Sequence, residues 1–370
     1  MLRKVVITGG GTGGHIFPAI AIGKALQHEF PDLELLYVGA QGRMEMEKVP
    51  AAGFQIVGLP IVGMPRRKNP FSLLRFIWKW RKSYRMARKL LRDFHPDAVV
   101  GVGGYASVPA MQAAQRLGVP TVIQEQNSFA GKANQMLAKK AKRIAVAYQG
   151  MESYFPAEKI VVTGNPVRQE LLGDLPPRDE SCAYLGIPAE TKNILVIGGS
   201  LGATRLSEAI LASSGAIAQR GDVTVLLQTG AADLEKMQRL YNENGRAANI
   251  HIVPFIARMD CAYAAADLIV SRAGAIAISE LSIVKKPLIL VPSPYVAEDH
   301  QTKNARVLSE AGAAILLPET EIQQRLWGTV EGLLADENKA RLMSLELSKL
   351  ARPNAAKDLA KMVASIDNCQ

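Results

Sequence analysis

Short runs of β-branched and other apolar residues alternate along this chain with longer stretches of helical periodicity. The first five runs span residues 4–8, 33–38, 98–101, 121–123 and 159–162. A second set follows at residues 193–197, 223–227, 250–253, 268–270 and 287–291. Strands of a parallel sheet are buried on both faces and are joined by helices, so each set is typical of a parallel sheet. The pattern predicts an α/β fold with two Rossmann-like, doubly wound parallel-sheet domains.

The two sets are separated by a Gly-Asn-Pro turn at residues 164–166, which marks a domain boundary. We expect a first domain over residues 1–164, a second over residues 165–352, and a cleft between them. Pro353 interrupts the last helical pattern. A terminal helix over residues 353–370 is expected to pack back on the first domain, although its periodicity does not itself show which domain it covers.

Composition supports a globular protein, because 48% of the 370 residues are hydrophobic and 21% are charged. The three cysteines, Cys182, Cys261 and Cys369, have no metal-ligand spacing and predict neither zinc nor a disulfide framework. The apolar run after the start is too short for a signal peptide. No run reaches the roughly 18 apolar residues of a membrane span.

The net charge of +10 is unevenly distributed. Residues 1–165 carry 23 Lys and Arg against 10 Asp and Glu (+13), whereas residues 166–370 carry 21 against 24 (−3). Within the first half, residues 66–92 hold eleven basic side chains and no acidic one. The first half is therefore expected to face an anionic partner.

Three glycine-rich turns follow strands and precede helices, at residues 9–14, 103–104 and 198–202. Glycine allows close approach of the backbone to a ligand, and the helix start that follows favours a phosphate or diphosphate. Gly9, Gly11 and Gly14 also match the dinucleotide motif G-x-G-x-x-G. The strand at residues 33–38 is not followed by the acidic residue that this motif uses to bind ribose.

Polar residues gather at other strand ends, where a doubly wound sheet binds its ligands. They include residues 124–127, residues 271–274 with Glu280 on the helix that follows, and residues 298–304. The chain contains no Asp-x-Asp and no spacing of His, Asp and Glu that suggests a metal site. We expect no metal and no cofactor, so helix N-termini and backbone N–H groups must hold a diphosphate.

Seven motifs together identify a family. They are Gly10-Gly11-Thr12-Gly13-Gly14-His15, Gly103-Gly104-Tyr105, Glu125-Gln126-Asn127, Gly164-Asn165-Pro166-Val167-Arg168, Gly198-Gly199-Ser200, Ser271-Arg272-Ala273-Gly274-Ala275 and residues 301–305. In this combination and order the chain closely resembles the bacterial peptidoglycan glycosyltransferases that add N-acetylglucosamine to lipid I. The resemblance covers essentially the whole chain.

This resemblance implies a GT-B fold and an inverting transfer from UDP-N-acetylglucosamine to the 4-hydroxyl of the N-acetylmuramoyl unit of lipid I. Lipid I is undecaprenyl-diphosphoryl-N-acetylmuramoyl-pentapeptide, and the products are lipid II, with a β-1,4 linkage, and UDP. The resemblance also implies a peripheral location on the cytoplasmic face of the inner membrane.

The resemblance further implies the substrate-binding residues. They are Thr12, Gly13, Gly14, Asn127, Arg168, Ser200, Ile256, Ala275, Ile276, Ala277, Ile278, Ser279, Glu280 and Gln301. The family pattern assigns uracil to the backbone at Ile256, ribose to Glu280, and the diphosphate to Ser200 and residues 275–279. Arg168 and Gln301 complete this set. Leu201, His300 and Gln124 depart from residues common in the family, and we assign no role to Gln124 or His300.

The transfer needs a base for the acceptor hydroxyl, and an imidazole suits proton transfer near neutral pH. His15 stands at the start of a helix, where its neutral form is favoured. A capping or ligand-orienting role for His15 remains the alternative. Glu125 is the next candidate base, and Asn127 is placed with His15 and Glu125 in the catalytic group.

The basic segment at residues 66–92 has helical periodicity with two faces. One face is expected to pack on the domain, through Leu73, Ile77, Trp80, Tyr84, Ala87 and Leu91. The other carries the predicted membrane-binding residues, Phe71, Leu74, Arg75, Trp78, Lys82, Arg85 and Lys89. Apolar residues among cations favour docking on an anionic membrane. The alternative is a solvated basic face.

Two other functions remain open at this point. A non-hydrolysing UDP-N-acetylglucosamine epimerase with the same GT-B architecture would need neither a membrane patch nor a lipid acceptor. A non-catalytic nucleotide- or nucleic-acid-binding protein would explain the basic segment. Aromatic RNA-binding motifs and zinc-finger spacings are absent from the sequence, so we expect no nucleic-acid partner.

Overall fold

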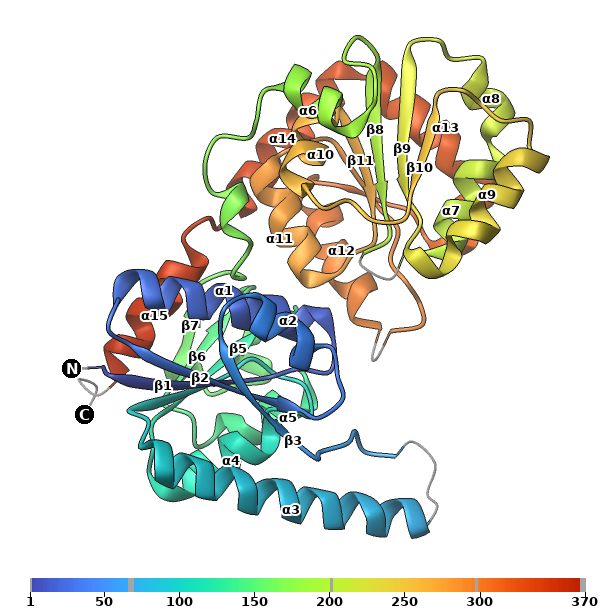
Figure 1. The fold of residues 1–370 in the computed structure, drawn as a ribbon. Coiled ribbons are helices and arrows are strands. Elements are labelled where there is room, and N and C mark those ends of the chain that lie inside the picture. The colour runs from blue at the N-terminus through green and yellow to red at the C-terminus, as the bar shows by residue number, and fades with distance from the viewer. Residues whose placement is uncertain (1, 66–69, 200–201, 297–298, 367–370) are drawn as a thin grey trace. The chain divides into compact units, whose positions relative to one another are not determined.

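The fold is known from a computed structural model that describes residues 2–65, 70–199, 202–296 and 299–366. Contacts divide the chain into two compact units (Figure 1). The first unit comprises residues 1–167 together with residues 352–370, and the second comprises residues 168–351. Each unit is built on one parallel sheet.

The first unit contains a seven-stranded parallel sheet in the order β3-β2-β1-β4-β5-β6-β7. Its strands are β1 (Lys4–Thr8), β2 (Glu34–Ala40), β3 (Gln55–Leu59), β4 (Ala98–Gly101), β5 (Thr121–Glu125), β6 (Arg143–Val146) and β7 (Ile160–Val162). The strand order reverses between β1 and β4, and this reversal opens a crevice at their carboxyl ends. The first two glycine-rich turns follow these two strands.

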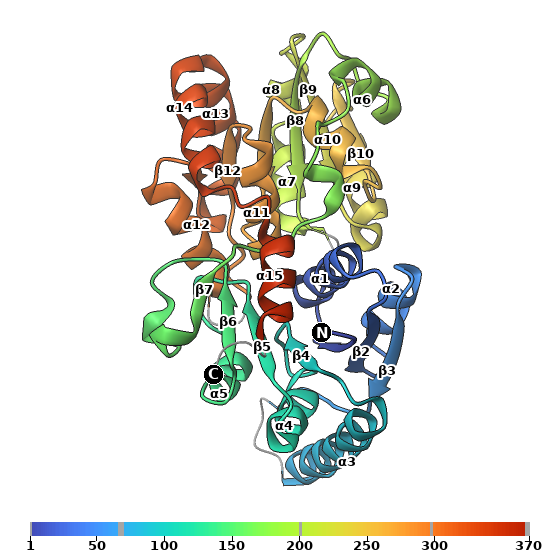
Figure 2. The ribbon, with the colours of Figure 1, turned by 90° about the vertical axis from the view of Figure 1, so that its left-hand side faces the viewer.

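Helices cover both faces of this sheet (Figures 1 and 2). They are α1 (Gly13–Glu29), α2 (Glu45–Ala51), α3 (Pro70–Phe94), α4 (Val108–Leu117), α5 (Lys132–Ala138) and α15 (Ala355–Ala364). Val5 and Ile7 of β1 point to the core under α1, α2 and α15, whereas Val6 points to the core under α3, α4 and α5. This alternation explains why the strands appear as continuous apolar runs.

The terminal helix α15 belongs to the first unit, although the whole second unit precedes it in the sequence. Its Leu359 and Val363 are fully buried in the same core as Ile16 and Ile22 of α1. Burial of this apolar face on α1 attaches the end of the chain to its beginning.

The second unit contains a six-stranded parallel sheet in the order β10-β9-β8-β11-β12-β13. Its strands are β8 (Lys192–Ile197), β9 (Val223–Gln228), β10 (Ile250–Val253), β11 (Leu268–Ser271), β12 (Leu288–Leu290) and β13 (Ile315–Leu316). Its helices are α6 (Arg178–Leu185), α7 (Thr204–Ala212), α8 (Ser214–Ala218), α9 (Leu234–Glu243), α10 (Met259–Ala265), α11 (Ala275–Val284), α12 (His300–Glu310), α13 (Ile322–Ala335) and α14 (Glu337–Leu350). The order again reverses, between β8 and β11, so both units place a crevice beside a glycine-rich turn.

The predicted α/β class with parallel sheets is confirmed, but three strands were not predicted. Strand β3 begins with Gln55 and contains Gly58, β6 begins with the charged Arg143, and β13 has only two residues. A polar start, an interrupting glycine or a length of two residues weakens the apolar run by which a strand is recognised.

Candidate active site

The first glycine-rich turn is held by a carboxylate from α2. The Gly11 N–H donates to Glu45 Oε1 and Oε2 at 3.2 and 3.1 Å, and the Ala40 N–H donates to Oε1 at 3.0 Å. Glu45 is only 1% exposed, and a Cβ on Gly10 would overlap its carboxylate. Sequence reasoning missed Glu45. The signal that could have indicated it is an acidic residue at the start of the helix that follows β2. Glu45 fixes the turn and occupies one of its N–H groups.

His15 lies between the first two glycine-rich turns. Its Nδ1 is 3.0 Å from Thr12 Oγ1. A Cβ on Gly103 would come within 3.0 Å of His15 Cδ2, and a Cβ on Gly104, whose φ is +75°, would come within 2.5 Å of the Gly10 carbonyl oxygen. Glycine is therefore required at both positions for the His15 ring to pack against the second turn.

Glu125 is buried and fully engaged. Its Oε1 accepts from the Asn127 N–H at 3.1 Å and from Asn127 Nδ2 at 3.3 Å. Its Oε2 accepts from the Gly131 N–H at 2.9 Å and from Asn134 Nδ2 at 2.8 Å. With four donors on a carboxylate that is 2% exposed, Glu125 holds the loop between β5 and α5. This arrangement favours a structural role for Glu125 and leaves His15 as the candidate base in this unit.

In the second unit, the third glycine-rich turn joins β8 to α7. The predicted diphosphate ligand Ser200 lies outside the described residues, as does Leu201. Gly202 has a φ of +80°, and a Cβ there would overlap the Thr229 carbonyl oxygen. This glycine lets the turn pass close to the end of β9 before α7 begins.

Glu280 of α11 is buried with two hydrogen-bond donors. Arg168 Nε donates to its Oε1 at 2.7 Å, and Tyr263 Oη donates to its Oε2 at 3.1 Å. Burial raises the pKa of Glu280, although Arg168 partly offsets this effect. Burial also raises the pKa of Tyr263 well above its ordinary value, so its phenol remains a donor. Sequence reasoning missed Tyr263, because it lies in an Ala-rich helix whose residues are typical of a buried core helix.

The other predicted donor residues lie at the same edge of the second sheet or near it. Ile256 is buried, so a ligand would meet its backbone rather than its side chain. Residues 275–279 form the first turns of α11, and Ser279 Oγ donates to the Ala275 carbonyl at 3.0 Å. Gln301 Oε1 accepts from the Ser293 N–H at 2.8 Å. These residues offer backbone N–H groups at a helix start, together with a positioned amide.

The predicted membrane-binding face of α3 is exposed. Phe71, Leu74 and Trp78 have exposed fractions of 82%, 64% and 60%, and Lys82 Nζ lies 5.3 Å from the centre of the Trp78 ring. The basic members of the face, Arg75, Lys82, Arg85 and Lys89, are exposed as well.

The opposite face of α3 differs from the prediction at its first turns. Leu73 and Ile77 were expected to pack on the domain, but they are 45% and 38% exposed, whereas Ala87 and Leu91 are buried. The helix has 25 residues, about 37 Å at 1.5 Å per residue, whereas the five-residue β3 spans about 17 Å. The first turns of α3 therefore extend beyond the sheet and cannot be covered by it (Figure 1).

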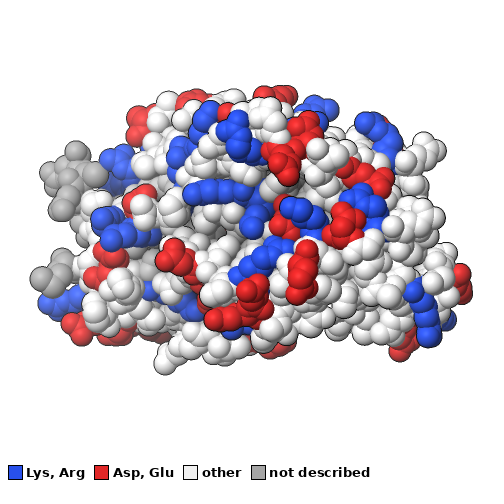
Figure 3. All heavy atoms as spheres, turned by 90° about the horizontal axis from the view of Figure 1, so that it is seen from above, with Lys and Arg blue, Asp and Glu red and all other residues white. Residues whose placement is uncertain are grey.

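Charge along α3 is positive until its last turn, where Asp93 lies. Residues 70–92 carry eight basic side chains and no acidic one. On the face of the molecule seen in Figure 3, by contrast, Lys and Arg are interspersed with Asp and Glu. Within the described ranges, no helix combines the length and apolar character needed to cross a membrane.

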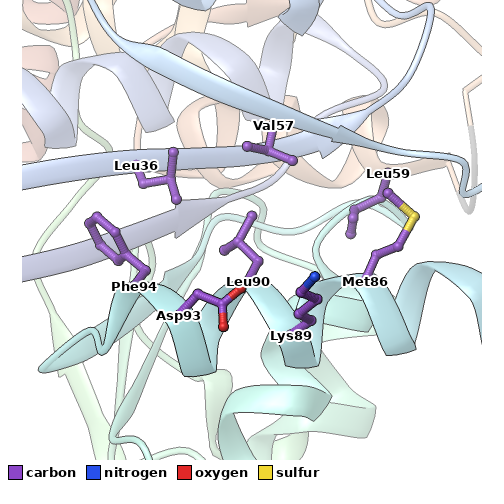
Figure 4. Close-up of a pocket in the computed structure, with 8 residues that line it drawn as sticks. All are labelled: Leu36, Val57, Leu59, Met86, Lys89, Leu90, Asp93 and Phe94. Atoms are coloured by element: carbon purple, nitrogen blue, oxygen red, sulfur yellow. The ribbon is translucent and has the colours of Figure 1, made fainter.

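A cavity of about 500 Å³ lies between α3 and the strands β2 and β3, of which β3 is the edge strand of the sheet (Figure 4). It is lined by Leu36, Val57, Leu59, Met86, Lys89, Leu90, Asp93 and Phe94. None of these residues is among the predicted substrate ligands, and the cavity is not formed by the glycine-rich turns. We therefore separate it from the candidate active site.

Comparison with known proteins identifies the class. Residues 5–146 match the glycosyltransferase family 28 N-terminal domain, and residues 193–361 match the glycosyltransferase family 28 C-terminal domain. The chain therefore belongs to glycosyltransferase family 28, as its motifs indicated.

Two relatives in the family carry the same name. The chain is 46% identical to a UDP-N-acetylglucosamine–N-acetylmuramyl-(pentapeptide) pyrophosphoryl-undecaprenol N-acetylglucosamine transferase of Bacteroides fragilis, covering 98% of this chain and 95% of that protein. It is 48% identical, with the same coverage, to the enzyme of that name in Porphyromonas gingivalis.

Solved structures agree with this assignment. The crystal structure of Acinetobacter baumannii MurG has a TM-score of 0.76 and 30% identity, covering 98% of this chain and 99% of that one. A UDP-N-acetylglucosamine 2-epimerase has a TM-score of 0.70 at 15% identity, covering 100% and 97%, which shows a shared fold alone. The GT-B fold implied by the motifs is confirmed.

Proposed function

We propose that this protein transfers N-acetylglucosamine from UDP-N-acetylglucosamine to lipid I, giving lipid II and UDP in peptidoglycan synthesis. The observation that carries the proposal is the identity of 44–48% to the transferases of that name over nearly the whole chain. The fold alone does not distinguish a transferase from an epimerase, because both classes occur among its structural neighbours.

The donor is bound by the second unit in this proposal. The start of α11 and the turn before α7 supply N–H groups and positive dipole ends for the diphosphate. Glu280 accepts hydrogen bonds from the ribose hydroxyls, because each carboxylate oxygen has a second acceptor position beyond those used by Arg168 and Tyr263. Ile256 contributes backbone contacts to uracil, and Gln301 binds the sugar.

The acceptor is bound by the first unit, where His15 acts as the base. With Nδ1–H donating to Thr12 Oγ1, the lone pair lies on Nε2 and takes the proton from the 4-hydroxyl of the acceptor. The hydroxyl oxygen then attacks the anomeric carbon as the bond to UDP breaks, which inverts the configuration. Asn127, fixed by Glu125, helps position the acceptor, and Thr12, Gly13 and Gly14 line the same turn.

In this proposal the enzyme is a peripheral protein on the cytoplasmic face of the inner membrane. The exposed apolar and basic side chains of α3 support this location, since an apolar side chain among cations inserts into an anionic membrane interface. Lipid I cannot leave the bilayer, so docking through α3 keeps the enzyme beside its acceptor.

The test is incubation of the purified chain with UDP-N-acetylglucosamine and a lipid I analogue, followed by the mass of the product. We expect the acceptor to gain one N-acetylhexosamine as UDP is released. Conversion of the donor to its 2-epimer without acceptor, or no reaction with either, would overturn the proposal.

A further inference from the structure

Arg205 lies next to the third glycine-rich turn, in the first turn of α7. Side chains in a helix lean toward its N-terminus, so the Arg205 side chain is directed toward the start of α7, where the first backbone N–H groups of the helix have no partner within it. The side chain is 59% exposed. It is therefore a cation beside the proposed diphosphate site, and neither the sequence motifs nor the comparisons assign it a role.

The contacts of Arg205 are weak for an arginine. Its Nε is 3.8 Å from Glu319 Oε1, and its guanidinium lies 5.9 Å from the centre of the Tyr295 ring. Among the residues that the structure describes, it makes no hydrogen bond. Arg168, in contrast, is bound to Glu280 at 2.7 Å. The donors of Arg205 are thus available to an incoming anion.

Glu319 keeps Arg205 near the turn without using its donors. The Glu319 side chain is 2% exposed, and its Oε2 accepts a hydrogen bond from Arg272, which also donates to the carbonyls of Val291 and Pro292 at 3.2 and 3.3 Å. Its Oε1 has no hydrogen-bond partner. Arg272 therefore anchors the carboxylate through one oxygen, and the other lies 3.8 Å from Arg205 Nε, an ion-pair distance too long for a hydrogen bond.

We propose that Arg205 binds the diphosphate of the UDP-sugar donor and leaves Glu319 when the donor arrives. This inference rests on the proposed function and extends its donor site by one residue. A guanidinium forms paired, charge-assisted hydrogen bonds with phosphate oxygens, which are stronger than the loose contact that Arg205 makes with Glu319. Asp233 accepts from the Thr204 hydroxyl and, within the described residues, forms no ion pair with Arg205.

The experiment compares Arg205→Ala and Arg205→Lys with Arg341→Ala, a control that removes an exposed arginine from α14 in the same unit. Dissociation constants for UDP and for uridine are measured on each full-length variant by calorimetry, with Tm as a check on folding. Arg205→Ala is expected to weaken UDP binding about 10- to 100-fold, because a charge-assisted hydrogen bond is lost. Uridine binding should stay within about twofold, since uridine carries no phosphate.

Arg205→Lys should recover part of the UDP affinity because it retains the charge, and Arg341→Ala should bind both ligands as the wild type does. Arg205→Ala binding UDP as tightly as the wild type would overturn the inference, and so would an equal loss of UDP and uridine binding, which indicates a structural role. Failure of this inference is distinguishable from failure of the proposed function. If the proposed function were wrong, the wild type itself would transfer no sugar to the lipid I analogue.

Discussion

At the scale of single residues, the environment of His15 determines what its imidazole can do. The ring is packed against Gly103 and its Nδ1 faces the Thr12 hydroxyl at 3.0 Å, so one tautomer directs the Nε2 lone pair away from Thr12. A general base contributes about 10² to 10⁴ in rate. A residue that only orients ligand contributes mainly to binding.

We predict that His15→Ala lowers kcat by about 10² to 10⁴ and leaves the donor KM nearly unchanged. Steady-state kinetics with a lipid I analogue measure both constants. His28→Ala is the matched control, because His28 lies at the exposed end of the same helix. Turnover of His15→Ala at the wild-type rate would remove the base role, and a raised KM with normal kcat would indicate an orienting role instead.

Tyr263 and Glu280 are a second pair of interacting residues, in which the phenol donates a 3.1 Å hydrogen bond to the carboxylate. We predict that Glu280→Ala raises the donor KM by about 10- to 100-fold, since hydrogen bonds to a charged group contribute about 1.5 to 3 kcal/mol. Tyr263→Phe keeps the Glu280 carboxylate but removes the hydrogen bond that fixes its orientation. It should therefore raise the donor KM several-fold, with little change in kcat at saturating donor.

The control for Tyr263→Phe is Tyr241→Phe, which also removes a phenol donor, in this case one bound to the Ala247 carbonyl at 2.8 Å. Its donor KM should equal that of the wild type. An unchanged donor KM in both Tyr263→Phe and Glu280→Ala would withdraw the ribose-binding role of Glu280.

At the scale of elements, the length of α3 relative to its sheet produces the membrane-docking surface. The first turns of α3 extend beyond the sheet, so Leu73 and Ile77 join Phe71, Leu74 and Trp78 as exposed apolar residues. Basic side chains near an anionic surface contribute about 1 kcal/mol each and are screened by salt, whereas apolar insertion is not screened. The surface is therefore larger than the single helical face that the sequence indicated.

We predict that Phe71→Glu with Trp78→Glu reduces binding to phosphatidylglycerol or cardiolipin vesicles and activity on membrane-embedded acceptor. Activity on a short-chain soluble acceptor should survive, because the substitutions lie outside the glycine-rich turns. Co-sedimentation at physiological salt measures the binding. Leu342→Glu with Leu345→Glu, two exposed positions on α14, is the control. If the α3 double variant pellets as the wild type does, α3 is a solvated face.

At the scale of the whole molecule, the chain leaves its first unit, builds the second, and returns through α15. Leu359 and Val363 are fully buried against α1, so the core of the first unit is complete only when the last helix has docked. The stability of the first unit therefore depends on residues that follow the whole second unit in sequence.

We predict that Leu359→Ala destabilises the first unit by about 2 to 5 kcal/mol, the usual cost of a large-to-small substitution in a core. Thermal denaturation should show the transition of the first unit at a lower temperature, with UDP binding by the second unit retained. Lys361→Ala, an exposed position on the same helix, should melt as the wild type does. Equal Tm values for the two variants would contradict this account of α15.

The sequence by itself determined the α/β class, two series of buried strands, the three glycine-rich turns and the family. These features are local, because burial on both faces leaves a continuous apolar run and a tight turn leaves glycine. The tertiary structure decided which side chains meet. It brought Tyr263 and Arg168 to Glu280, placed Glu45 against Gly11, left Leu73 uncovered and docked α15 on α1. Such contacts depend on distances between segments far apart in the chain and on the relative lengths of packed elements, and no local periodicity encodes either quantity.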